Sequence, residues 1–230
     1  MQRSVRRRLG RPFEDDFRAL KALNLPPDGL VLDIGGNRGQ SIDAVRLFMP
    51  KARIVSFEPN PLVADELKRL YADDRRVEIR SIALGNRPGE LSLYIPYYNG
   101  WMFDGLASLD KAEAENWLSS DNLAGFDREC LEIRSVTCEV ATLDDLMSDA
   151  APVFVKIDVQ GFEANVLDGG RMMLERARPV VMTETRNDVD MLDHLPAAYM
   201  AAFWDGERMV RGQRQTLNTF FLPETIARHF

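Results

Sequence analysis

The sequence predicts an α/β protein in which helices cover both faces of a mostly parallel, doubly wound sheet. Short β-branched runs alternate along the chain with segments whose apolar residues recur at helical spacing. Twice, at 30–39 and at 154–163, such a run reaches an aspartate and turns through glycine into a helix. Right-handed crossovers bring the carboxyl ends of parallel strands to one edge, where ligands of open sheets bind. We therefore look for the functional site at these strand ends.

The elements follow one another without a linker or an internal repeat. A first helix at 13–24 ends before Pro26-Pro27. Beyond it we expect strands at 30–34, 53–57, 77–84, 91–95, 133–140, 153–159, 179–185 and 220–222. Helices fill most of the intervals, including a short one at 111–119, one capped by Thr142 and one at 162–175.

The domain organisation predicted is a single domain over 13–230 behind a basic, flexible leader at 1–12. Residues 97–130 are aromatic and lack a clear period, so we expect them to form a lid or substrate loop. The leader lacks the apolar core of a signal peptide, and no apolar run approaches the ~20 residues of a membrane span.

Composition excludes several function classes. The formal net charge of −7 disfavours binding to nucleic acid. Cys130 and Cys138 have neither zinc nor redox spacing, which is typical of a chain in a reducing compartment. We expect a cytoplasmic protein.

The turn after the first strand has the chemistry of a nucleoside-binding loop. Asp33-x-Gly35-Gly36-x-x-Gly39 lets the backbone approach a ligand, and Glu58 ends the next strand, where an acidic residue accepts hydrogen bonds from ribose. A dinucleotide would need the pattern G-x-G-x-x-G and a site that can bind its anionic pyrophosphate. Asp33 would repel that anion but attract the cationic methionine part of S-adenosylmethionine. The electrostatics favour the second ligand.

The chain resembles the FkbM family of S-adenosylmethionine-dependent methyltransferases over about residues 30–222. The similar segments are 31–40, 57–61, 83–86, 105–109, 142–146, 155–163 and 166–170. Their most specific piece is Lys156-Ile157-Asp158-Val159-x-Gly161-x-Glu163. The chain departs from the family at Gly36, where alanine is frequent, and at Gln160, where glutamate is frequent.

The resemblance implies a Rossmann-like class I methyltransferase fold of seven strands, the last antiparallel. It implies an enzyme that transfers a methyl group to a small-molecule or glycan partner, usually to a hydroxyl oxygen of a sugar, glycolipid or polyketide-type product. Asp33, Gly35 and Gly39 would line the methionine part of the donor, Glu58 would bind ribose, Ala83 would lie near adenine, and Asp158 would face the methyl group. The predicted donor site also includes Gly36, Asn37 and Pro59.

A hydroxyl acceptor must lose its proton, so the reaction calls for a general base. We expect a carboxylate, Asp158 first and Glu184 second, with Lys156 as a catalytic or charge-pairing residue. Asp158, Glu184 and Asp144 could alternatively hold magnesium, but spacing alone does not favour a metal. Two further functions stay open, a nicotinamide-dependent oxidoreductase and a non-catalytic protein that binds the donor.

Overall fold

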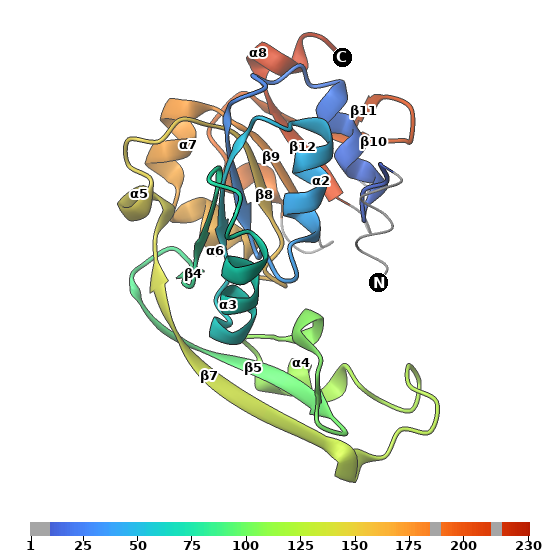
Figure 1. Ribbon diagram of the computed structural model, residues 1–230. Coiled ribbons are helices and arrows are strands. Elements are labelled where there is room, and N and C mark those ends of the chain that lie inside the picture. The colour runs from blue at the N-terminus through green and yellow to red at the C-terminus, as the bar shows by residue number, and fades with distance from the viewer. Residues whose placement is uncertain (1–9, 185–189, 213–217) are drawn as a thin grey trace.

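The computed structural model describes residues 10–184, 190–212 and 218–230, and it places an eight-stranded sheet at the centre (Figure 1). The strand order is β11-β10-β12-β9-β8-β1-β2-β3. Its members are β1 (Leu30–Ile34), β2 (Arg53–Phe57), β3 (Val77–Arg80), β8 (Pro152–Ile157), β9 (Val180–Glu184), β10 (Tyr199–Trp204), β11 (Met209–Arg211) and β12 (Asn218–Pro223).

The sheet is parallel from β3 to β9, and β12 pairs antiparallel with both β9 and β10. The predicted antiparallel last strand is thereby confirmed, although the sheet has eight strands rather than seven. The register sets Asp33 of β1 opposite Ser56 of β2 and Lys156 of β8. Three polar side chains therefore stand in one row near the carboxyl edge.

Helices cover both faces of this sheet (Figure 1). The 3-10 helix η1 (Asp15–Lys21) and α2 (Gln40–Phe48) pack on one face, over a core that includes Val31 and Phe154. The opposite core contains Leu32 and Val155. Successive residues of a strand point to opposite faces, which explains why buried strands are apolar throughout. Beside this sheet the chain also forms α3 (Pro61–Leu70), α5 (Leu143–Leu146), α6 (Glu163–Asp168), α7 (Arg171–Ala177), η4 (Met191–His194) and α8 (Glu224–Ala227).

Two predicted helices differ from those observed. The helix expected at 13–24 is the shorter 3-10 helix η1, and the helix expected at 162–175 is divided into α6 and α7 at Gly169-Gly170. A Cβ on Gly169 would lie 1.9 Å from the Gly85 carbonyl oxygen. The division lets the backbone pass close to that segment. The expected Thr142 cap is confirmed, since its hydroxyl accepts from the Asp145 amide at 3.0 Å.

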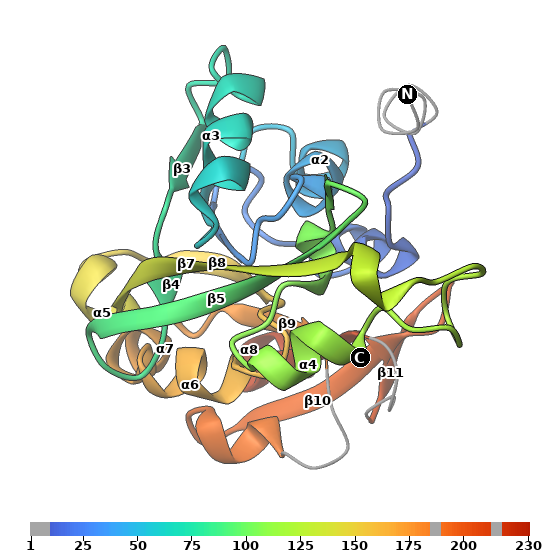
Figure 2. The ribbon, with the colours of Figure 1, turned by 90° about the horizontal axis from the view of Figure 1, so that it is seen from below.

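A second sheet projects from the body as an arm (Figures 1 and 2). Its order is β4-β7-β5-β6, with β4 (Ala83–Leu84), β5 (Gly89–Tyr98), β6 (Trp101–Met102) and β7 (Leu131–Ala141). Strands β5 and β7 pair antiparallel along the full length of β5. The region expected as irregular contains η2 (Asp104–Leu106), α4 (Lys111–Asn116) and η3 (Arg128–Cys130).

The arm corrects the strand predicted at 77–84. Residues 77–80 form β3 at the edge of the main sheet, whereas 83–84 form β4 and pair with β7. The two halves of one predicted strand thus belong to different sheets. In the described part of the chain, no helix combines the length and apolarity required to cross a membrane.

Candidate functional site

A cavity of about 440 Å³ opens at the carboxyl ends of β1, β2 and β8. It is bounded on one side by the arm, which contributes Leu93 of β5 and Asp104 of η2. Most of the sequence-predicted residues line it, namely Gly35, Gly36, Asn37, Glu58, Pro59, Ala83, Lys156 and Asp158. Among the predicted residues, Asp33, Gly39 and Glu184 do not line it.

The glycine loop has the close backbone approaches that the sequence suggested. Gly35 has φ of +82°, and a Cβ on it would lie 1.9 Å from the Asp158 carbonyl oxygen. A Cβ on Gly36 would lie 2.2 Å from the Ser56 hydroxyl oxygen. Gly39, with φ of +77°, precedes the first turn of α2. Larger residues would push the loop away from β8, so the cavity floor depends on glycine here.

Glu58 is buried at the end of β2, and backbone amides hold both of its oxygens. The Asn37 amide donates to Oε2 at 2.7 Å, and the Asn60 amide donates to Oε1 at 2.9 Å. Burial raises the pKa of Glu58 to about 7, the two amide hydrogen bonds oppose this rise, and the Asp33 and Asp104 charges add to it. Each carboxylate oxygen has a second lone pair, so the ionised group can still accept from a ligand.

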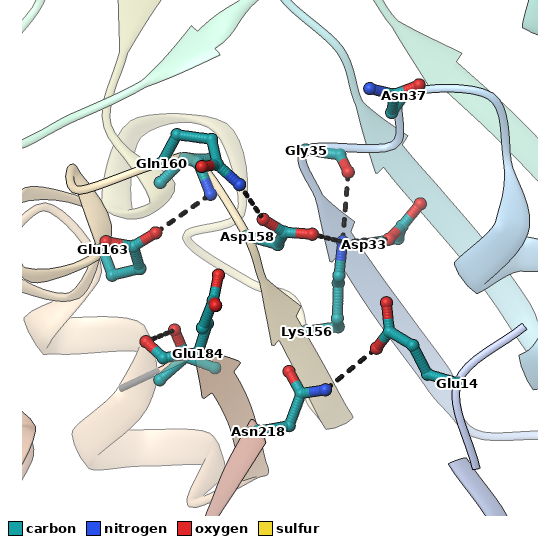
Figure 3. A network of polar contacts seen from close by, with 12 residues as sticks. Glu14, Asp33, Gly35, Asn37, Lys156, Asp158, Gln160, Glu163, Glu184 and Asn218 are labelled. Carbon is teal, nitrogen blue, oxygen red and sulfur yellow. Dashed lines mark hydrogen bonds and ion pairs between the residues drawn. The ribbon is translucent and has the colours of Figure 1, made fainter. Parts of the chain in front are cut away.

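Lys156 is the buried cation of the site (Figure 3). Its ammonium donates to the Gly35 carbonyl at 3.1 Å, and it lies 3.2 Å from Asp158 Oδ2 and 3.9 Å from Asp33 Oδ1. Burial alone would lower the pKa of Lys156, but the surrounding carboxylates, Asp158 first, raise it above its ordinary value. The side chain therefore stays charged and joins β1 to β8.

Asp33 lies beneath the loop, where it braces the sheet. The Ser56 hydroxyl donates to its Oδ2 at 2.7 Å, and only 1% of the residue is exposed. Its Oδ1 is buried without a hydrogen-bond partner among the described residues. The sequence predicts that Asp33 contacts the donor; in the structure this carboxylate lies next to the cavity, outside its lining, and pairs with Ser56.

Asp158 begins the turn that leads into α6. Its Oδ1 accepts from Gln160 Nε2 at 3.1 Å, while its Oδ2 faces Lys156. Gln160 and Gly161 both have positive φ, at 55° and 93°. Glu163 Oε1 accepts from the amides of Val159 and Gly161 at 3.1 and 3.2 Å, which fixes this strained turn.

Two predicted ligands of the weaker metal hypothesis lie elsewhere. Glu184 is exposed at the end of β9. Asp144 accepts from the amides of Met172 and Met173 at the start of α7. In the described ranges, no group of three or more His, Cys, Asp or Glu side chains is arranged to hold a metal ion.

Sequence reasoning missed Glu14 and Asp104, which line the cavity. Glu14 precedes η1 and accepts from Asn218 Nδ2 of β12 at 2.9 Å. Asp104 accepts from Arg38 in a two-point contact, with Nε at 2.8 Å and Nη2 at 3.0 Å. Both contacts join distant parts of the chain, so no local motif points to them.

Comparison with known proteins agrees with this architecture. The chain is 27% identical over 164 residues to 2-O-methyltransferase NoeI of Sinorhizobium fredii, covering 70% of this chain and 65% of the relative. It is 28% identical over 193 residues to the AMB antimetabolite synthetase AmbE of Pseudomonas aeruginosa, covering 74% of this chain and 9% of the relative. The chain thus spans less than two thirds of each of these relatives.

The crystal structure of methyltransferase FkbM from Methylobacillus flagellatus KT superimposes with a TM-score of 0.53. The match covers 85% of this chain and 44% of that one at 15% identity, and it confirms the predicted class I methyltransferase fold. The model of the methyltransferase FkbM domain matches residues 33–200, the larger part of the sequence, and the chain belongs to the FkbM methyltransferase family.

Proposed function

We propose that this protein transfers a methyl group from S-adenosylmethionine to a hydroxyl oxygen of a sugar, glycolipid or polyketide-type natural product. The observation that carries the proposal is the distribution of charge in the cavity. One region holds Glu58 with lone pairs available for ribose, and the other holds Asp158 beside the glycine loop. A pyrophosphate would meet carboxylates in both regions, whereas a sulfonium would be attracted.

The residues present fit the donor. Glu58 would accept from the ribose hydroxyls, and the apolar walls at Ala83 and Phe162 would receive the adenine. The methionine part would lie along Gly35 and Gly36, toward Asp158. A carboxylate that accepts from ribose is the usual device of this fold.

When bound, S-adenosylmethionine supplies an electrophilic methyl group, and the chain's task is to orient the acceptor and move a proton. Alignment of donor and acceptor and exclusion of water supply much of the acceleration. Asp158 lines the cavity with 33% of its side chain exposed, and it is our candidate for the group that receives the hydroxyl proton. Lys156 holds that carboxylate in place through its Oδ2.

The insertion at 97–130 is our candidate for the acceptor side. Asp104, Gly105, Ala107 and Leu109 from this insertion line the cavity. Arg38, which follows the glycine loop, donates to Asp104 and also to Glu66. The names of the two sequence relatives, an O-methyltransferase and an antimetabolite synthetase, support a hydroxyl acceptor and a natural-product setting.

Calorimetric titration of the protein with S-adenosylmethionine, S-adenosylhomocysteine and NAD tests the proposal. We expect both adenosyl ligands to bind, and we expect Glu58→Ala to lose at least about tenfold in affinity, because ribose loses a charged acceptor. Glu78→Ala is the matched control, since this exposed glutamate lies on β3 and pairs with Arg80. Binding of NAD alone would support the oxidoreductase instead.

An acceptor screen with radiolabelled methyl donor completes the test. We expect transfer to a hydroxylated sugar or polyketide acceptor, and we expect Asp158→Asn to reduce turnover more than donor affinity. Donor binding without transfer to any acceptor would favour the non-catalytic alternative.

A further inference from the structure

Glu14 gives the cavity a carboxylate that lies outside the segment shared with the family. It lines the same cavity as Lys156 and Asp158, and Asn218 Nδ2 holds it at 2.9 Å. Both Glu14 and Asn218 fall outside residues 33–200, which match the family model. Figure 3 shows the Lys156 side chain between Asp158 on one side and Asp33 and Glu14 on the other.

Negative charge exceeds positive charge at this end of the cavity. The Lys156 ammonium pairs with Asp158 at 3.2 Å and with Asp33 at 3.9 Å, and Glu14 lines the same cavity, so three carboxylates lie near one cation. Burial raises the pKa of the Glu14 carboxyl, an effect that Lys156 and the Asn218 hydrogen bond partly offset. Asp33 Oδ1 accepts no hydrogen bond from the described residues, and its charge is balanced only by Lys156 at 3.9 Å. Buried charge that is incompletely paired is costly, and a cationic ligand would relieve the cost.

We propose that Glu14 makes the cavity distinguish the positively charged methyl donor from the neutral thioether that the reaction leaves behind. This inference rests on the proposed function. In the transfer, the bond from methyl carbon to sulfur breaks as the bond from that carbon to the acceptor oxygen forms. The electron pair of the broken bond stays on sulfur, and the hydroxyl proton passes to a carboxylate and then to solvent.

The donor therefore carries one more positive charge than the product. A carboxylate in the cavity wall stabilises the bound donor more than the bound product, because the interaction between charges falls only slowly with distance in a partly buried site. Glu14 would thus favour exchange of spent product for fresh donor. Its role is specificity for the charged ligand, separate from the proton transfer assigned to Asp158.

Glu14→Gln tests this role, because the amide keeps an oxygen that can accept from Asn218 but lacks the charge. Calorimetric titrations would use S-adenosylmethionine, S-adenosylhomocysteine and adenosine. We expect affinity for S-adenosylmethionine to fall about tenfold and affinity for S-adenosylhomocysteine to change by less than roughly twofold. Adenosine lacks the methionine part, and its unchanged affinity would show that the site is intact.

Asp16→Asn is a matched control. Asp16 Oδ2 also accepts from Asn218 Nδ2, at 3.2 Å, but Asp16 does not line the cavity. This variant also removes a carboxylate charge, but from a side chain outside the cavity wall, and it should change the ratio of the two affinities much less than Glu14→Gln does. Glu14→Asp, which keeps the charge on a shorter side chain, should recover most of the ratio.

Each outcome decides between the two proposals. Equal weakening of both adenosyl ligands by Glu14→Gln would overturn the inference, since Glu14 would then contact a part that the ligands share. Unchanged affinities for both ligands would overturn it as well. If Glu14→Gln fails to fold, Glu14→Ala would be titrated in its place, and equal changes in the two affinities would refute the role in the same way. Absence of adenosyl binding to the wild type would instead refute the proposed function.

Discussion

Protonation of Glu58 should control the affinity for S-adenosylmethionine. The pKa of this carboxyl is raised to about 7 by burial, so its charge changes within the neutral range. Only the ionised group offers an acceptor at both oxygens, because its two amide contacts occupy one lone pair on each. The ionised fraction is about ten elevenths at pH 8 and about one eleventh at pH 6, so affinity should fall about tenfold between these values.

Calorimetry at a series of pH values measures this change. Glu58→Gln provides the baseline, because it cannot ionise and reports any titration of the ligand's own α-ammonium group. The nearby Cys138 thiol has a pKa raised to about 11, chiefly by burial, so it does not titrate between pH 6 and pH 8. A wild-type profile parallel to that of the Gln variant would refute the assignment of Glu58 to ribose.

The same group should affect folding with the opposite sign. A carboxyl whose folded pKa is raised contributes stability below its unfolded value of 4.5, and this contribution is lost as pH rises through about 7. The rise in the pKa of Glu58 from 4.5 to about 7 corresponds to a difference of about 3 kcal/mol in the free energy of unfolding. Urea unfolding without ligand should therefore show wild-type stability declining relative to Glu58→Gln over this range, while donor affinity increases.

Three further substitutions test the framework of the site. Gly35→Ala should abolish donor binding and lower the unfolding free energy by at least about 2 kcal/mol in urea titrations, because its Cβ would meet the Asp158 carbonyl and φ is +82°. Lys156→Met should cost about 3–5 kcal/mol in the same assay, since it leaves Asp33 and Asp158 without their cation, and a loss under 1 kcal/mol would contradict this. Glu184→Gln should change turnover by less than roughly twofold, because this exposed carboxylate does not line the cavity; a loss comparable to that of Asp158→Asn would restore it as the base.

The sequence was sufficient for features that depend on neighbouring residues. A β-branched run that ends on a carboxylate and continues through glycine specifies both a strand end and a close backbone approach. For that reason the positions of Gly35, Glu58 and Asp158 could be predicted. The same reasoning predicts that Asp33 contacts the donor, but it could not predict that Asp33 pairs with Ser56 across the register.

Features that depend on pairing between distant segments could not be predicted in this way. Nothing local to 77–84 shows that its last two residues pair with β7 in the arm. The spacing of apolar residues also does not predict the contact between Glu14 and Asn218, because that contact depends on where β12 pairs in the sheet. Contacts of this kind supply a wall of the cavity, and they are the part that sequence reasoning missed.

We propose that charge, more than glycine spacing, determines which donor this cavity accepts. A glycine loop after the first strand can hold either a pyrophosphate or an amino acid, so the loop alone leaves both open. Among the described residues, the cations that line the cavity are Arg38 and Lys156. Arg38 is bound to Asp104 and Glu66, and Lys156 is held by the Gly35 carbonyl and two carboxylates. A pyrophosphate would have to break these pairs, whereas a sulfonium with an α-ammonium group leaves them in place and meets the remaining negative charge.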